Sequence, residues 1–307
     1  MPQDLVPLLM PKNVKPQTVA PKRSKKLIYA AVALIIVLIP AVYFYSISVT
    51  QPSEAKAAII DQLGAPALDP AVRDENQTFI DSAEELLYER FSIVDYYSDN
   101  ATVEEYSKLA SQGYKLILWR AHSALALNSN YIAISTTDKY PSINYEQYPD
   151  GSLTLCNITG DPNLYFAITP TFIEQVMTGT FQDTVIVLMC CNGLQQGYLE
   201  TAQALEAKGA KVIISWDNWI SDSDNDYGTS ILLHYLIDEN DTVSEAVSQV
   251  PTFSSEFAPA TQLQYDPVNS DAGNYRVPDY RTYASTNSAL MIVPVSEKVE
   301  EPRGNRF

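Results

Sequence analysis

The chain has 307 residues, 37 acidic against 20 basic, and a formal net charge of −17. This acidic balance disfavours nucleic acid and anionic lipid as partners, because both are recognised through clustered lysine and arginine. The three cysteines, Cys156, Cys190 and Cys191, cannot all pair, and adjacent cysteines bond to each other only under severe strain. The chain is therefore not a disulfide scaffold, and a free thiol outside a cell needs a functional reason.

The N-terminal residues predict a membrane anchor. Residues 27–45 (LIYAAVALIIVLIPAVYFY) carry no charge, and at about 1.5 Å rise per residue they nearly match a hydrocarbon core of roughly 30 Å. Residues 1–26 hold six basic residues against one acid, so the positive-inside rule keeps this tail cytoplasmic and the remainder extracytoplasmic. A cleaved signal peptide is the alternative, but its apolar core is usually only roughly 7–15 residues long. The lipid bilayer is thus a predicted partner through residues 27–45.

The rest of the chain divides into three predicted parts. Residues 46–54 form a short polar stalk, residues 55–250 an α/β domain, and residues 251–307 a loop-rich extension with an edge strand near residues 289–295. Four Asn-x-Ser/Thr sequons would be glycosylation acceptors outside the cell if the source glycosylates its proteins. They begin at Asn76, Asn100, Asn157 and Asn240.

The first half of the domain alternates between strand-like and helix-like patterns. Buried strands are predicted at residues 57–61, 91–97 and 115–121, and an amphipathic helix at residues 75–90. Thr102 is the expected N-cap of a further helix, because Glu105 three residues later completes the capping-box pattern. The strand at residues 115–121 (KLILWRA) ends on His122.

The second half continues the alternation after an interruption. Between residues 125 and 169, turn-forming residues separate short β-like pieces, which predicts a β-hairpin insertion. Strands are then predicted at residues 184–190 and 211–216, helices at 171–178, 198–208 and 228–236, and an acidic loop at 217–226. Continuous apolar strands between amphipathic helices predict a mostly parallel sheet covered by helices on both faces. The predicted fold class is therefore α/β, preceded by one transmembrane helix.

Reactive side chains follow two of these strands. His122 comes directly after residues 115–121, and Cys191 directly after the very apolar run of residues 184–190. In an open α/β sheet, ligands bind outside the carboxyl ends of the strands. An imidazole beside a thiol can act as the base that makes it a nucleophile. Gly193 would let the following turn bring backbone N–H groups near a developing oxyanion.

The order strand–His, strand–Cys and the sequence VIVLMCCNG resemble the caspase-like cysteine peptidases, which include caspases, legumains, gingipains, separases and CHAT-domain proteins. The resemblance extends over residues 57–250. It implies that Cys191 is the nucleophile, that His122 is the general base or acid, and that no cofactor takes part. The family usually has glycine directly after the histidine, where its amide helps to form the oxyanion hole. Here Ser123 stands at that position, and its Cβ restricts the backbone.

The acidic loop has two interpretations. The resemblance places it beside the residue that precedes the cut bond, where Asp217 or Asp222 would bind arginine or lysine. The alternative is a solvated acidic turn. Residues 222–226 lack the glycine and the closing glutamate of a calcium loop, so no metal site is predicted.

The resemblance, together with the predicted anchor, implies a membrane-anchored, extracytoplasmic cysteine peptidase that cleaves a peptide or protein substrate through an acyl-enzyme. A non-catalytic module that holds a peptide or partner in the same cleft is the alternative, and a structural surface protein is a third interpretation. His234 is expected on a helix surface, and Cys156 is expected to be structural. The oligomeric state is not predicted.

Overall fold

A computed structural model describes residues 55–254, 260–268 and 270–281. The predicted tail, membrane helix and stalk, and the predicted edge strand near residues 289–295, lie outside the described residues. Among the residues that are described, no helix is both long enough and apolar enough to cross a membrane.

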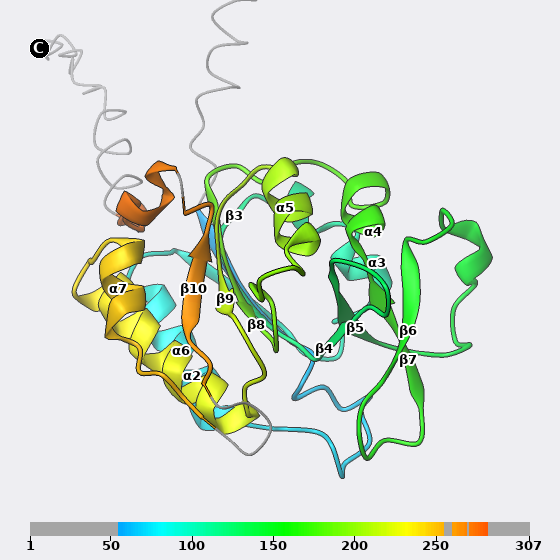
Figure 1. Ribbon diagram of the computed structural model, residues 1–307. Coiled ribbons are helices and arrows are strands. Elements are labelled where there is room, and N and C mark those ends of the chain that lie inside the picture. Colours follow the sequence, from blue (N-terminus) through cyan, green and yellow to red (C-terminus); the bar gives the residue numbers. More distant parts are fainter. Residues whose placement is uncertain (1–54, 255–259, 269, 282–307) are drawn as a thin grey trace, which may run out of the picture. The chain divides into compact units, whose positions relative to one another are not determined.

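The main sheet has six strands in the order β2-β1-β3-β8-β9-β10 within the described chain (Figure 1). They are β1 (Lys56–Asp61), β2 (Ile93–Tyr97), β3 (Tyr114–Arg120), β8 (Thr184–Met189), β9 (Ala210–Trp216) and β10 (Leu263–Asp266). Neighbouring strands from β2 to β9 pair in parallel, whereas β10 runs antiparallel to β9. The predicted mostly parallel α/β sheet is therefore confirmed.

Helices cover both faces of this sheet (Figure 1). On one face lie α2 (Gln77–Tyr88), α6 (Asp222–Leu233) and α7 (Val243–Gln249), which pack in one core cluster. On the other face lie α3 (Val103–Tyr106), α4 (Pro170–Gln175) and α5 (Glu200–Ala207), which pack in a second cluster. Successive strand residues point to opposite faces, so Leu118 enters the first cluster and Trp119 the second. This two-sided burial explains why the strands read as continuous apolar runs.

A second, antiparallel sheet with the order β4-β5-β7-β6 follows β3. Its strands are β4 (Ser123–Leu125), β5 (Ile132–Lys139), β6 (Leu153–Asn157) and β7 (Leu164–Ile168). Side chains of β5 and β7 pack with α3 and α4 on one side, while Ala65 and Leu68 pack against the other. The predicted insertion is thus β structure, but it forms a four-stranded sheet where a hairpin was expected.

The predicted acidic loop is shorter than expected, because α6 already begins at Asp222. The Ser221 hydroxyl caps this helix by accepting a hydrogen bond from the Asp224 N–H at 3.2 Å. The acidic residues of its first turn also favour the positive end of the helix dipole. Asp222 and Asp224, which were expected in a loop, therefore form part of the first turn of α6.

Two further elements were not predicted. Helix α7 begins at a capping box in which Thr242 and Glu245 exchange both hydrogen bonds, a signal that is visible in the sequence. Strand β10 comes from the segment predicted as an extension, and it pairs with β9 from Leu263↔Trp216 to Asp266↔Ile213. Four residues carry too little periodicity to be recognised as a strand.

Candidate active site

A cavity of about 380 Å³ contains most of the predicted site residues. It is lined by His122, Ser123, Cys191 and Asp222, among others. Strands β3 and β8 are parallel neighbours, so the residues that follow them reach the same edge of the sheet. The chain therefore places its candidate nucleophile and its candidate base in one cavity.

The adjacent thiols of Cys190 and Cys191 differ in their surroundings. Cys190 is 2% exposed and belongs to the core cluster of α4 and α5, whereas Cys191 is half-buried and packs against the cluster of α2 and α6. Both reach the cavity wall, but burial raises the pKa of the Cys190 thiol to about 12. Burial also raises the pKa of Cys191, and the charge of Asp222 adds to this effect. The Cys191 thiol therefore rests protonated and donates to the Ile220 carbonyl at 3.4 Å.

The His122 imidazole is neutral in this cavity. Burial lowers the pKa of His122 to about 4, and the positive charge of Arg120 contributes in the same direction. Its backbone N–H donates to Gln62 Oε1 at 2.9 Å, and its carbonyl accepts from the Ser135 N–H at 2.9 Å. Its Nε2 atom is buried and has no hydrogen-bond partner among the described residues. The ring is thus uncharged near neutral pH, and its Nε2 atom is an enclosed polar atom without a partner among the described residues.

Ser123 connects the two sides of the cavity, because its hydroxyl donates to the Cys191 carbonyl at 2.6 Å. In the antiparallel β4–β5 ladder, hydrogen-bonded and non-hydrogen-bonded residue pairs alternate. The Ser135 N–H donates to the His122 carbonyl, so the next pair, Ser123 opposite Ile134, is a non-hydrogen-bonded one. The amide of Ser123 therefore points away from β5. The φ angle of Ser123 is not positive, so its Cβ does not force the backbone into a strained conformation. The restriction expected from the sequence is therefore absent at this residue.

In the turn after β8, the residue in the left-handed conformation is Asn192, with φ of 59°. Gly193 is required for space: a Cβ there would lie 2.0 Å from Ser215 Oγ and 2.7 Å from Ser215 Cβ. The amides of Asn192 and Leu194 donate at 2.9 Å to the carbonyls of Asn218 and Trp216. Gly193 thus lets the turn pack on β9, and these two neighbouring amides are already used by the fold.

The two predicted pocket acids lie in different places. Asp222 lines the cavity, where burial and the charge of Asp74 raise its pKa to about 6 against the opposing effect of Arg120. Asp217 lines a different pocket, and its carboxylate accepts a hydrogen bond from the Gln262 N–H at 2.8 Å. Asp222 is therefore the one of the two that can meet a ligand beside Cys191.

A buried arginine next to the site was not identified from the sequence. Arg120 is fully buried, and its guanidinium donates to Asp226 at 2.7 and 2.8 Å, to Asp61 at 2.8 Å, and to Asp74. These carboxylates come from β1, from the loop before α2, and from α6, so one charge cluster joins these three segments to β3. An arginine inside an apolar strand was the available signal, because a buried charge requires partners.

Several cavity residues were also missed or assigned otherwise. Cys156 was expected to be structural, and its thiol does donate to Ser135 Oγ at 3.1 Å, but it also lines the cavity. Further lining residues come from separate segments: Asn157, Thr159, Trp219 and Asn225. His234 lies on the surface and pairs with Asp238 at 2.9 Å, which confirms its prediction.

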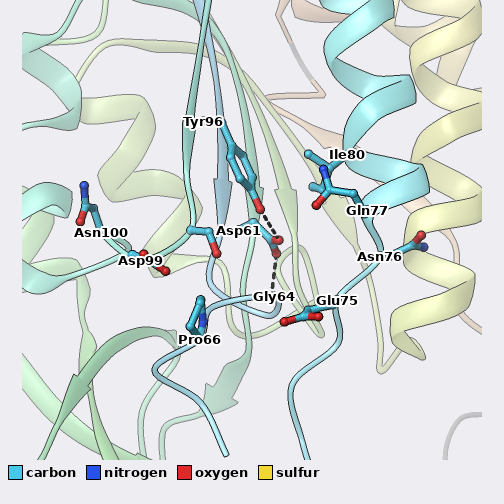
Figure 2. A pocket seen from close by; sticks show the side chains of 11 residues that line it. Asp61, Gly64, Pro66, Glu75, Asn76, Gln77, Ile80, Tyr96, Asp99 and Asn100 are labelled. Carbon is cyan, nitrogen blue, oxygen red and sulfur yellow. Dashed lines mark hydrogen bonds between the residues drawn. The ribbon is translucent and has the colours of Figure 1, made fainter. Parts of the chain in front are cut away.

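A second cavity, of about 500 Å³, lies at the carboxyl ends of β1 and β2 (Figure 2). Asp61 stands in its wall, where it accepts hydrogen bonds from the Gly64 N–H at 2.9 Å and the Tyr96 hydroxyl at 3.2 Å. Glu75 and Asp99 make this wall acidic, but no histidine or cysteine lines it. The described residues also contain no cluster of His, Cys, Asp or Glu that could hold a metal ion. Of these two cavities, only that of His122 and Cys191 is lined by a thiol and an imidazole.

No protein-family model matches the chain, and no curated protein matches it significantly.

The burial of His122 makes the free energy of unfolding depend on pH. Its pKa is about 4 in the folded chain and about 6.5 in an unfolded one, so the unfolded chain binds the proton first as the pH falls. The stability from the neutral ring is present above about pH 6.5 and is lost toward pH 4, by up to about 3 kcal/mol. Asp222 acts oppositely, because a pKa raised by folding makes its contribution grow as the pH falls below about 6.

A variant comparison isolates the histidine from Asp222. From about pH 7 to about pH 4.5, the wild type is expected to lose more stability than His122→Asn, in which only the titrating group is absent. Urea unfolding of the full chain in detergent measures both values. An equal loss in the two proteins would show that His122 titrates in the folded chain as it does in water.

Proposed function

We propose that the chain is a cysteine peptidase of the caspase-like class, anchored in a membrane with its α/β domain extracytoplasmic. One observation carries the proposal: His122 and Cys191 follow neighbouring strands and line the same cavity at the carboxyl end of a mostly parallel sheet. The order of histidine strand and then cysteine strand is also that of the family which the sequence resembles. The substrate would be a peptide or protein, and no cofactor is needed for the chemistry.

The resting charges of the pair indicate how the reaction would begin. The Cys191 thiol is protonated and the His122 ring is neutral, so the attack does not start from a preformed ion pair. The imidazole accepts the thiol proton as sulfur bonds to the scissile carbonyl carbon. Collapse of the tetrahedral intermediate breaks the C–N bond, and the leaving amine takes the proton from the imidazolium. Water then hydrolyses the thioester and frees the thiol.

Ser123 is the proposed donor to the developing oxyanion. Its amide points away from β5, and its hydroxyl contact with the Cys191 carbonyl holds it beside the nucleophile. Because β4 is extended, a serine serves here in the place of the family's usual glycine. The role that the sequence interpretation gave to Gly193 is not carried into the proposal, since Gly193 acts in packing.

A non-catalytic peptide-binding module on the same fold is the alternative. Two observations favour it: the raised pKa of Cys191 and the lowered pKa of His122. A protonated thiol is a weak nucleophile until a base takes its proton, and an imidazole with a pKa of about 4 accepts that proton poorly. The reactivity of Cys191 and its dependence on His122 therefore separate the two functions.

Thiol labelling tests this dependence. In the full chain with Cys190→Ala, iodoacetamide is expected to alkylate Cys191 faster than Cys156 near pH 7, because His122 can accept the proton of Cys191. Replacing His122 with alanine should lower the alkylation rate of Cys191 by at least about tenfold, which is less than the usual contribution of a general base. The alkylation rate of Cys156 should not change. Mass spectrometry of the two cysteine peptides gives both rates. Slow and equal labelling, with or without His122, would favour the binding module.

The proposed orientation predicts a protease-protection pattern. Protease added outside intact cells is expected to degrade the α/β domain and to leave a small fragment that contains residues 1–45, because six basic residues hold the tail in the cytoplasm. An immunoblot against an N-terminal tag detects the fragment, and an intact cytoplasmic protein serves as the control. Full protection of the domain in cells with an accessible surface would overturn the orientation.

A further inference from the structure

We infer that Asn225 is a substrate-binding residue, and that Asn225 and Asp222 together select a carboxamide side chain, that of asparagine or glutamine. The inference rests on the proposed function, because it assigns the substrate class of the same cavity. It departs from the arginine or lysine that the acidic loop alone suggests, and the departure comes from Asn225.

The carboxamide of Asn225 has a fixed orientation. Its Oδ1 atom lies 2.7 Å from the indole Nε1 of Trp216, which is fully buried. An indole nitrogen can only donate a hydrogen bond, so the atom facing it must be the amide oxygen. The amide nitrogen is therefore directed away from Trp216.

This nitrogen is a donor without an acceptor in the described part of the chain. Asn225 is 2% exposed and lines the cavity, and its one side-chain hydrogen bond there is the bond that Trp216 donates to its oxygen. The nitrogen is not one of the enclosed polar atoms that lack a partner, so it reaches the cavity, where water can accept its hydrogen bond. An oxygen atom of a ligand in the cavity would take the place of that water.

Asp222 supplies the complementary acceptor. It precedes Asn225 by three residues on α6, so the two side chains share a helix face, and both line the cavity. Helix α6 thus contributes an N–H donor and a carboxyl acceptor to the cavity wall. A carboxamide presents the matching oxygen and N–H group.

Other polar side chains match this wall less well. Lysine and arginine carry only donors, so they would pair with Asp222 and leave the Asn225 amide unsatisfied. Aspartate and glutamate would face the charge of Asp222, and no lysine or arginine lines the cavity to offset it. A site built to hydrogen-bond both groups discriminates strongly against a ligand that lacks one of them.

Peptide binding to the Cys191→Ala protein tests the inference without requiring turnover. Fluorescence anisotropy would compare labelled peptides Ala-Ala-X-Ala, in which X is asparagine, glutamine, lysine, glutamate or leucine, with the full chain in detergent. The asparagine or glutamine peptide is expected to bind at least about tenfold more tightly than the other three. Tighter binding of lysine, or no ranking at all, would overturn the inference.

Replacing Asn225 with aspartate sharpens the test. The substitution keeps an oxygen toward Trp216 and the size of the side chain but exchanges the donor for an acceptor, so the preference should switch to lysine. Asn240→Asp makes the same chemical change at an exposed position with φ of 56°, which aspartate tolerates, and should leave the ranking unchanged. Circular dichroism checks folding, and if Asn225→Asp does not fold, Asp222→Ala must abolish the ranking instead. An unchanged ranking in the folded variants would refute the role of the pair.

Hydrolysis of the same peptides by the wild-type chain separates this inference from the proposed function. Ranked binding without hydrolysis contradicts the peptidase and leaves the selectivity standing. Hydrolysis with no preference for asparagine or glutamine contradicts the selectivity and leaves the peptidase standing.

Discussion

Replacing Cys191 with alanine is expected to abolish peptide hydrolysis while the fold survives. The side chain is half-buried at the cavity wall, so the change removes the nucleophile and little packing. His122→Ala should be comparably inactive, and the double variant no worse, because residues that act as a unit do not show additive losses. We expect a fall of at least about 10³-fold in kcat/KM, measured with a fluorogenic peptide and the full chain in detergent.

Cys190→Ala is the matched control for this prediction. Its thiol has a pKa of about 12 and lies in the core cluster of α4 and α5, so it takes no part in the proposed reaction. The change should lower the free energy of unfolding modestly, by about 1 kcal/mol, and retain activity. Activity that survives Cys191→Ala but is lost in Cys190→Ala would identify the other thiol as the nucleophile. Activity that survives both would remove cysteine catalysis.

Replacing Arg120 with methionine is expected to be the most destabilising of these changes. It would leave the carboxylates of Asp61, Asp74 and Asp226 together without their cation, and Asp61 and Asp226 are almost completely buried. Removing one partner of a buried ion pair lowers the free energy of unfolding by about 3–5 kcal/mol. The loss should shrink in acid, because burial raises the pKa of Asp226 while Arg120 lowers it, and protonation relieves the unpaired charge.

Arg276→Met is the comparison for Arg120. Arg276 pairs with Glu245 at 3.1 Å on the surface, and such a pair contributes about 0–1 kcal/mol. Urea unfolding gives both free energies, and a loss at Arg120 no larger than that at Arg276 would mean that the buried cluster adds no net stability. Arg120→Met should also raise the pKa of His122, whose NMR signal is one of only two histidine signals in the chain.

The sequence determined the local structure and the class of the fold. The apolar run at residues 184–190 became β8 (Thr184–Met189), and its two buried faces explain why it does not alternate. Thr102 caps α3 by accepting the Glu105 N–H at 3.2 Å, as its pattern predicted. His122 and Cys191 stand at the ends of neighbouring parallel strands, and the rule that such strands share one edge was sufficient to predict that both line one cavity.

Only the tertiary structure decided which neighbouring residues belong to the site. Asp217 and Asp222 are five residues apart, but the start of α6 brings Asp222 to the cavity while Asp217 binds the segment before β10. The carboxylates that pair with Arg120 are 59, 46 and 106 residues away along the chain. Hydrophobic periodicity and capping depend on residues within a few turns of one another, so they can be read from the sequence. Which charge is buried, and which amide is left to face a ligand, depends on contacts between distant segments that no local pattern contains.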